Sequence, residues 1–405
     1  MNASLWSAIL VAFLDSLGIG LIYPLFSVML FDPSCCMLAA DTSSATRGLW
    51  LGGLLSAMPL AQFFSAPIWG TISDRRGRRA PLQWSLVIAA VGYAVALAGV
   101  SWANLWILVL SRMILGIAAG NIAIILATIS DVSTPETKVK NYGLFSMGLG
   151  AGYTLGPLLG GVATEWGGYH ASFGVSLLAI LANLFFVWKA FRETHHQPVH
   201  KRLSWSIGFH NLKKALSYKG IRLIFLCSFL HHFSWSYFFE FVPVFLMQHY
   251  FFSALDLGYF YGFVGACYAL SAGLLIRPLI KRFRPLLLFF SGNVLTALTI
   301  LLILVIPSPL WIWPLLLVMA YVIALVMPNA ITFISNQAGP QLQGEALGVL
   351  TSVNTFALVL SPLCSGSLVG KIPTLPIWVG GVIMLATGLF GFIVLRKALL
   401  SREDA

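Results

Sequence analysis

The sequence predicts an all-α integral membrane protein with twelve transmembrane helices in two pseudo-symmetric six-helix bundles. Of its 405 residues, 59% are hydrophobic and only 9% are charged, and the mean hydropathy is +0.88. Because a soluble domain is about 45–50% apolar and roughly 25% charged, this composition excludes soluble enzymes, disordered proteins and nucleic-acid-binding domains. A helix needs about 20 apolar residues to cross a bilayer. The chain contains twelve such stretches, at 5–30, 48–71, 81–100, 105–130, 141–164, 171–191, 221–247, 257–279, 286–306, 310–334, 345–369 and 377–396.

The twelve stretches form two groups of six, separated by a hydrophilic segment. We therefore expect a six-helix bundle over 1–191, a cytoplasmic linker over 192–220, and a second six-helix bundle with a short cytoplasmic tail over 221–405. Landmarks recur between the halves, as when Pro157 is matched by Pro362 at an offset of 205 residues. Many secondary transporters consist of two such repeats, with the binding site between them near the middle of the membrane.

The net charge of +11, from 24 basic and 13 acidic residues, reports topology. With the N-terminus in the cytoplasm, only Arg47 and Lys371 fall in outer loops, so the positive-inside rule places both termini in the cytoplasm. The charge then needs no nucleic-acid partner. The N-terminus lacks the basic region of a signal peptide, so we expect it to be retained. The short loops favour a bacterial inner membrane. The basic residues of the predicted inner loops include Arg75, Arg76, Arg78, Arg79, Lys138, Lys140, Lys201, Arg202, Lys213, Lys214, Lys219, Lys281, Arg282 and Arg284.

Motifs for metals, cofactors and ATP do not stand out. The five cysteines show neither CxxC spacing nor a disulfide framework. His195, His196 and His200 could suggest a metal site, but Pro198 interrupts any helix that would align them. The sequence around Lys371 departs from the phosphate-binding loop pattern. We therefore predict no metal, no cofactor and no enzymatic activity.

The strongest motif lies between the second and third predicted helices. It reads Gly70-Thr-Ile-Ser-Asp74-Arg75-Arg76-Gly77-Arg78-Arg79 and resembles the G-x-x-x-D-R-x-G-R-R/K signature of the major facilitator superfamily at every defining position. Physically, its glycines allow two helices to approach and turn tightly. The resemblance implies a cytoplasmic gate in which a loop arginine pairs with an acid matching Asp131 in the outward-open state.

The fifth predicted helix carries a stripe of glycines on one face. They stand at Gly148, Gly152, Gly156 and Gly160, with Pro157 and Gly161 beside them. Such a stripe allows close backbone packing, and the proline bends the helix. The segment resembles the antiporter motif of proton-coupled drug exporters. Generic small-residue packing is the alternative interpretation.

Two charged residues lie inside predicted helices of the first half. Asp15 is roughly 15 Å deep at about 1.5 Å per residue, close to the bilayer midplane. Its segment, LDSLGIGLIYPLF, resembles the first helix of the tetracycline/proton antiporters. Arg112 lies roughly a third of the way into the membrane, where the resemblance implies a link to proton transfer. Buried charges are costly and usually functional; a structural ion pair is the alternative for Arg112.

The seventh predicted helix departs from the tetracycline-type pattern. His231 and His232 lie near mid-depth, and Glu240 lies about 14 Å further outward. A histidine can carry or relay a proton near neutral pH, or simply bond within the bundle. Trp235 and Tyr237 could line an aromatic substrate pocket. Glu240 could form a gate or be solvated. Further polar candidates, which we do not rank, are Asn121, Asn293, Asn329 and Asn354.

Together these features predict a proton-coupled secondary transporter that works by alternating access and exports small amphipathic or drug-like molecules in exchange for protons. The alternative is an uptake symporter or dedicated exporter of a specific polar metabolite, such as an amino acid or carboxylate chelator. A receptor or assembly factor that kept the fold is disfavoured because Asp15, Asp74, Arg112 and Asp131 are all present. The expected partners are a small-molecule substrate, protons and the lipid bilayer, and we expect a monomer.

Overall fold

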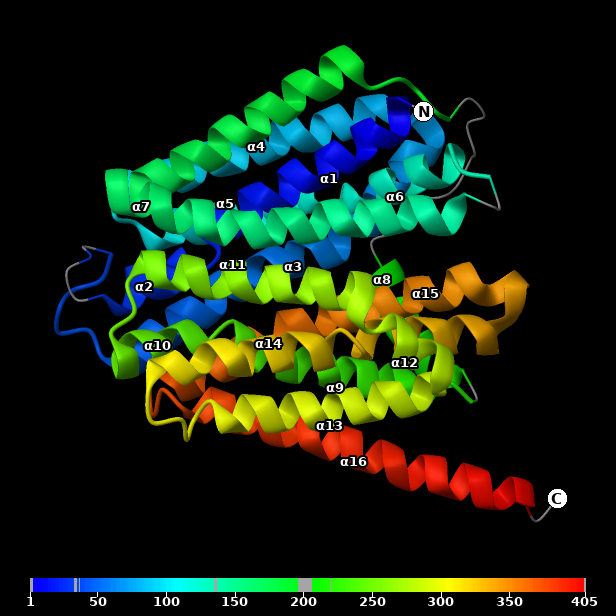
Figure 1. Cartoon of the computed structure of the whole chain (residues 1–405). Helices are drawn as coiled ribbons and strands as arrows, with labels where there is room; N and C mark the ends of the chain where they lie inside the picture. The colour runs from blue at the N-terminus through cyan, green and yellow to red at the C-terminus, as the bar shows by residue number, and fades with distance from the viewer. Residues whose placement is uncertain are drawn as a thin grey trace. The chain divides into compact units, whose positions relative to one another are not determined.

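The computed structural model describes residues 3–32, 35, 37–134, 137–195, 206–218 and 220–403, and within these ranges it contains helices and connecting turns but no strand (Figure 1). The first seven helices are α1 (Ala3–Ile22), α2 (Leu25–Phe31), α3 (Ser44–Arg76), α4 (Arg79–Ser101), α5 (Leu105–Ala119), α6 (Ile122–Asp131) and α7 (Lys138–Ala190). They are followed by α8 (Ile207–Ser217), α9 (Arg222–Phe239), α10 (Val242–Tyr250), α11 (Ala254–Leu270), the π-helix η1 (Ser271–Leu275) and α12 (Arg277–Arg282). The remaining elements are α13 (Pro285–Leu302), the 3₁₀-helix η2 (Pro309–Trp311), α14 (Ile312–Ile323), α15 (Val326–Val369) and α16 (Leu375–Glu403).

Ten helical segments of the described chain are long and apolar enough to cross a membrane. One of them, Lys140–Ala190, has 51 residues, or roughly 77 Å of helix at 1.5 Å per residue, which is far more than a bilayer of about 30 Å needs. Gly167 and Gly168 have non-helical backbone angles, with φ of +66° at Gly168, so this segment makes two crossings. The pair α9 and α10 completes the set where the seventh span was predicted. The predicted fold of twelve helices in two six-helix halves is confirmed.

Several crossings are broken helices, which the sequence analysis did not predict. The first breaks before Pro24, between α1 and α2, where proline lacks a backbone donor. The fourth breaks at Gly120 and Asn121, between α5 and α6. A Cβ at Gly120 would lie 2.6 Å from the Ser65 hydroxyl oxygen, so only glycine fits there. The break brings Asn121 into the interior of the bundle.

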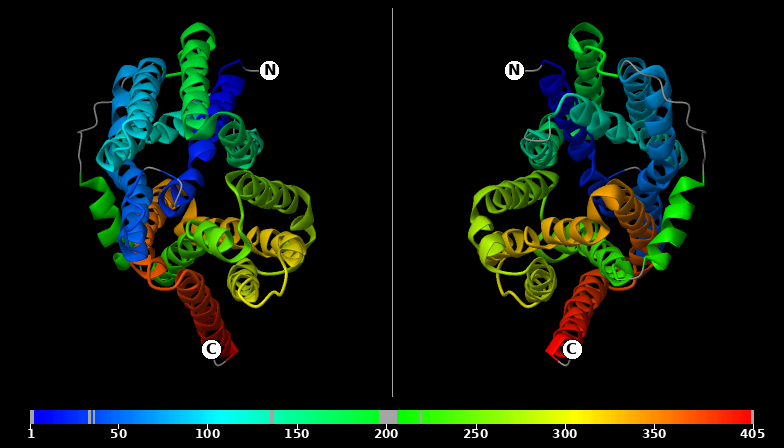
Figure 2. Two further views of the ribbon diagram at one scale, coloured as in Figure 1. Left: turned by 90° about the vertical axis from the view of Figure 1, so that its left-hand side faces the viewer. Right: turned by 90° about the vertical axis from the view of Figure 1, so that its right-hand side faces the viewer.

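Contacts divide the chain into two compact units. Figure 2 views many of the helices more nearly along their axes than Figure 1 does. Unit 1 contains Met1–Gly208 and Phe251–Gly265, and unit 2 contains Phe209–Tyr250 and Ala266–Ala405. Within unit 1, α7 packs along α1 and α4, and α5 packs on α3 and α4. Within unit 2, α9 packs on α15 and α16. The predicted boundaries at 191 and 221 rest on chain order and internal repetition, whereas these units are defined by contacts between residues. The predicted boundaries therefore stay a prediction.

The described part of the segment predicted as a polar linker contains one helix, α8. Leu212 and Ala215 pack it onto an apolar cluster that includes Val349 and Leu350 of α15. Of the linker residues named above, His196, Pro198, His200, Lys201, Arg202 and Lys219 lie outside the described residues.

Candidate transport site

Asp15, in the middle of α1, is held by two amides. Asn121 Nδ2 donates to its Oδ2 at 2.7 Å, and Asn183 Nδ2 donates to its Oδ1 at 2.8 Å. Asn121 and Asn183 are only 4% and 0% exposed. The break between α5 and α6 positions the first amide, and α7 carries the second. Both carboxylate oxygens therefore accept a hydrogen bond from a neutral donor inside an apolar bundle.

A cavity of about 80 Å³ opens beside this carboxylate within unit 1. Besides Asp15 and Asn121, its polar lining includes Gln62, Tyr93 and Tyr153. Gln62 is held in place because its Nε2 donates to the carbonyl of Ala119 at 3.3 Å. The volume suffices for a few water molecules, each of which takes about 30 Å³ in the liquid. The carboxylate thus faces a cavity of mixed lining, in which a few polar side chains stand among apolar ones.

Arg112 of α5 lies in the same interior and is 1% exposed. Its guanidinium carbon is 5.1 Å from the centre of the Phe26 ring, and its Nε donates to the carbonyl of Leu54 at 3.4 Å. Tyr93 and Tyr153 interact electrostatically with both Asp15 and Arg112. One negative and one positive group therefore share the interior of unit 1.

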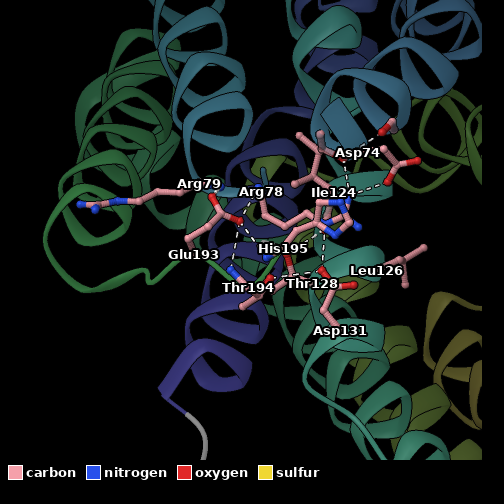
Figure 3. A network of polar contacts seen from close by, with 12 residues as sticks. Asp74, Arg78, Arg79, Ile124, Leu126, Thr128, Asp131, Glu193, Thr194 and His195 are labelled. Atoms are coloured by element: carbon pink, nitrogen blue, oxygen red, sulfur yellow. Dashed lines mark hydrogen bonds and ion pairs between the residues drawn. The ribbon is translucent and has the colours of Figure 1, made fainter. Parts of the chain in front are cut away.

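Arg78 joins the end of α3 to the end of α6 (Figure 3). Its Nη1 donates to Asp74 Oδ1 at 2.7 Å and to Ser73 Oγ at 2.8 Å, while its Nε donates to Asp131 Oδ2 at 2.9 Å. Burial by itself would lower the pKa of Arg78, but the hydrogen bonds and charges of Asp131 and Asp74 raise it above its usual value. The guanidinium therefore stays charged and holds two helix ends together.

Glu193, which the sequence analysis missed, completes this cluster just beyond α7 (Figure 3). Its carboxylate accepts hydrogen bonds of 2.7–3.1 Å from four backbone N–H groups, those of Arg78, Arg79, Thr194 and His195. Burial acts to raise the pKa of Glu193, but these donors outweigh it and lower the pKa below 4.5. The only signal in the sequence was a single acid at the start of a basic segment. We call Ser73, Asp74, Arg78, Asp131 and Glu193 the latch cluster.

The other motif residues have distinct environments. Gly77 has φ of +84°, and a Cβ there would lie 2.5 Å from Glu193 Oε2, so both conformation and space require glycine. Arg79 Nη2 donates to the carbonyl of Trp188 at 2.6 Å. Arg75 is exposed. A Cβ at Gly70 would make ordinary contact with Ala123 at 3.8 Å, so that glycine is not sterically required.

The glycine stripe of α7 packs on the backbone of α1. A Cβ at Gly152, Gly156 or Gly160 would lie 2.0–2.8 Å from a carbonyl oxygen of α1. A Cβ at Gly148 would lie 3.2 Å from the carbonyl oxygen of Ile9. Gly161 faces another way, because its Cβ would lie 2.9 Å from the carbonyl of Ala254 at the start of α11. Pro157 also contacts α1, with its Cδ 3.1 Å from the Cβ position of Gly20.

The two histidines of α9 point to different partners. His231 is 3% exposed, and its Nδ1 lies 2.9 Å from Asn293 Oδ1, while His232 Nδ1 lies 3.1 Å from the carbonyl of Ser228. Their rings are 5.3 Å apart and nearly perpendicular. This geometry favours a bond within the bundle for His231. Glu240, where α9 ends, is 8% exposed, so the solvated alternative for this residue is wrong.

The two predicted aromatic residues of α9 have different neighbours. Trp235 stacks on Phe239 with ring centres 5.0 Å apart. Tyr237 is 4% exposed and faces α16, where a Cβ at Gly380 would lie 2.9 Å from its own Cβ. Among the described residues, no group of three or more His, Cys, Asp or Glu side chains could hold a metal ion.

Comparison with known proteins assigns the family. Residues 8–362 match the family model of the Major Facilitator Superfamily. The chain belongs to this superfamily. It is 27% identical to the class E tetracycline resistance protein of Escherichia coli, over 98% of this chain and 95% of that protein. It is 30% identical to major facilitator superfamily domain-containing protein 10 of Bos taurus, over 78% of this chain and 72% of that protein.

The solved structures agree on the fold. The crystal structure of the human organic anion transporter MFSD10 aligns with a TM-score of 0.71 at 21% identity, covering 96% of this chain and 99% of that one. The superfamily consists of transporters that generally need no cofactor, so this chain is a multi-pass membrane transporter and not an enzyme.

Proposed function

We propose that this transporter is a proton-coupled antiporter that exports small amphipathic or drug-like molecules and takes up protons through Asp15. The observation that carries the proposal is the intramembrane carboxylate bonded to Asn121 and Asn183 beside a cavity that further polar side chains help to line. The match to a tetracycline resistance protein over nearly the full length of both chains supports it.

The chemistry of this carboxylate gives a physical basis for exchange. When Asp15 is ionised, its bonds to the two amides are charge-assisted and strong; protonation makes them neutral and weaker. Asn183 Oδ1 is buried and has no hydrogen-bond partner among the described residues. After a rotation of the amide, that oxygen can accept the hydrogen of a protonated Asp15. Protonation thus rearranges contacts that join α1 to α6 and α7.

Competition at one carboxylate produces antiport. A proton and a substrate bearing a positive or donor group cannot both use the same ionised oxygen, so binding of one favours release of the other. We propose that the latch cluster lies on the cytoplasmic side and holds it closed during part of this cycle, and that the close α1–α7 contact is a surface that rearranges as access alternates. The proposal includes cytoplasmic termini, a bacterial inner membrane and a monomer.

Everted membrane vesicles test the proposal. After the interior is acidified, a pH-sensitive dye reports proton release when tetracyclines, cationic drugs, amino acids or carboxylates are added. We expect release with an amphipathic compound in the native protein and none in Asp15→Asn, while Asp41→Asn, at an exposed outer turn, behaves as native. Equal release in the native protein and Asp15→Asn would reject Asp15 as the coupling group. Silence across the panel would reject broad drug export.

The second candidate is transport of an organic anion or another polar metabolite. Two observations favour it: the buried guanidinium of Arg112, and the similarity to MFSD10, whose human form is described as an organic anion transporter. In that case carboxylates, not cations, would move protons, and uptake would show the opposite sign of proton movement. Arg112→Gln would abolish the signal with anions.

A further inference from the structure

The helix inside the linker, α8, has one face that α15 covers and one that remains exposed. Asn211 Nδ2 donates to Ser352 Oγ at 2.9 Å, and Lys214 Nζ lies 2.6 Å from Glu345 Oε1. Leu212 and Ala215 lie on the same side and join the apolar cluster of unit 2. These contacts fix the rotation of α8 about its own axis.

The opposite face combines apolar and basic side chains. Its exposed members are Phe209, His210, Lys213, Leu216 and Ser217. Since successive residues of a helix are rotated by about 100°, these five positions form one continuous face. Phe209 is 51% exposed and Leu216 is 74% exposed, which is unusual for a helix of a connecting segment. They lie on one edge of the face, with Lys213 beside them.

The connectivity of the chain holds α8 at the membrane surface. α8 ends at Ser217, and the membrane-crossing pair α9 and α10 begins at Arg222. Five residue steps span at most about 18 Å even when fully extended. The C-terminal end of α8, where Leu216 lies, therefore cannot leave the neighbourhood of the inner surface of the bilayer.

The charge of the segment selects the kind of lipid. Between Arg192 and Arg222 the sequence has seven Lys or Arg residues and one acid, Glu193, which gives 7 − 1 = +6. The anionic headgroups of an inner leaflet attract such juxtamembrane basic segments. An amphipathic helix with apolar side chains beside lysines lies in the interface with its apolar edge below the headgroups.

We propose that the exposed face of α8 is an in-plane lipid-binding surface. Phe209 and Leu216 insert among the acyl chains of the inner leaflet, and Lys213 binds the phosphate of an anionic phospholipid. The inference is independent of the transported substrate. It gives the linker a second role, as an anchor that fixes α8 against both α15 and the bilayer.

Spin-label accessibility tests the insertion. A nitroxide is attached to Leu216→Cys or, as the matched control, to Ser217→Cys, in a full-length chain whose five native cysteines are replaced and whose thermal unfolding midpoint is unchanged. The protein is reconstituted alone in liposomes of phosphatidylcholine and phosphatidylglycerol. We expect the ratio of collision rates with oxygen and with a water-soluble nickel chelate to be at least fivefold higher at position 216 than at 217. Equal ratios would overturn the proposal and point to a protein partner or to solvent.

A second pair of variants tests the role of charge. With the label at position 216, Lys213→Gln or liposomes of phosphatidylcholine alone should lower the ratio at least twofold. Lys281→Gln, which removes an exposed lysine from α12, should leave it unchanged. A ratio that does not respond to Lys213→Gln or to the lipid would overturn the binding of an anionic headgroup.

Discussion

Replacing Gly160 by alanine tests the packing of α7 on α1. The new Cβ would lie 2.0 Å from the carbonyl oxygen of Leu21 and 2.8 Å from its carbon, whereas ordinary contact begins at 3.4 Å. Since 3.4 − 2.0 is 1.4 Å, and the obstacle is backbone, one helix must move by about that distance. Overpacking of this kind typically costs about 1–3 kcal/mol and occasionally more.

Gly150 of the same helix provides the control. A Cβ there would meet nothing within 4 Å, and alanine favours a helix over glycine by about 1 kcal/mol. We expect Gly150→Ala to unfold at or above the native midpoint. At about 2–4 °C per kcal/mol for a folding unit of 150–250 residues, the size class of unit 1, Gly160→Ala should unfold roughly 2–12 °C lower. Detergent-solubilised proteins heated at one scan rate give the comparison. Equal midpoints for the two variants would refute the close α1–α7 contact.

Three further predictions concern polar groups near the membrane surfaces. Arg78→Lys keeps the charge but loses the planar fork, so we expect about a tenfold slower transport rate in proteoliposomes. The control Arg282→Lys, at an exposed position of α12, should be unaffected. Because the pKa of Glu193 lies below 4.5 in the folded protein, its stabilisation is full above pH 4.5 and is lost as the pH falls through the lower folded value. Thermal midpoints from pH 3 to 7 should therefore fall at the acid end in the native protein, and Glu193→Gln should be less stable near neutrality and lack that component. Arg47 is 7% exposed and donates to the carbonyls of Leu30, Ala39 and Thr42 at 2.6–3.1 Å. Arg47→Ala should lower the free energy of unfolding by about 2–4 kcal/mol, measured as a lower thermal midpoint and faster proteolysis of the segment between α2 and α3. An unchanged midpoint would contradict this role.

The sequence predicted the helices well because the thickness of a bilayer sets the length of each apolar run. It did not predict the breaks, since average hydropathy is insensitive to a local interruption such as that at Gly120. The charged motif identified Arg78 and Asp131, but their shared geometry with Glu193 depends on the packing of α3, α6 and the end of α7. Asn183 was missed because one asparagine in an apolar helix is as consistent with interhelical bonding as with a functional site.

The linker shows the same limitation in another form. Its basic residues were interpreted by the positive-inside rule as marking the cytoplasmic side, which stays a prediction, and that explanation concealed the periodicity of α8. Only the contacts of Asn211 and Lys214 with α15 reveal which face is covered. For His231, the sequence could not indicate the partner that the structure places 2.9 Å away, Asn293 Oδ1, and its role in proton transfer stays a prediction.

The short helix α6 connects two polar centres that lie far apart in the bundle. Asn121 directly precedes it and bonds to Asp15, while Asp131 is its last residue and bonds to Arg78. Its ten residues make a rod of roughly 15 Å, which transmits tilt without bending. The break at Gly120 separates α6 from α5, so α6 can tilt independently of α5. A tilt that alters the bond between Asn121 and Asp15 would also move Asp131, which bonds to Arg78. The proposed protonation of Asp15 would therefore act on the same short helix that carries Asp131 and its ion pair with Arg78.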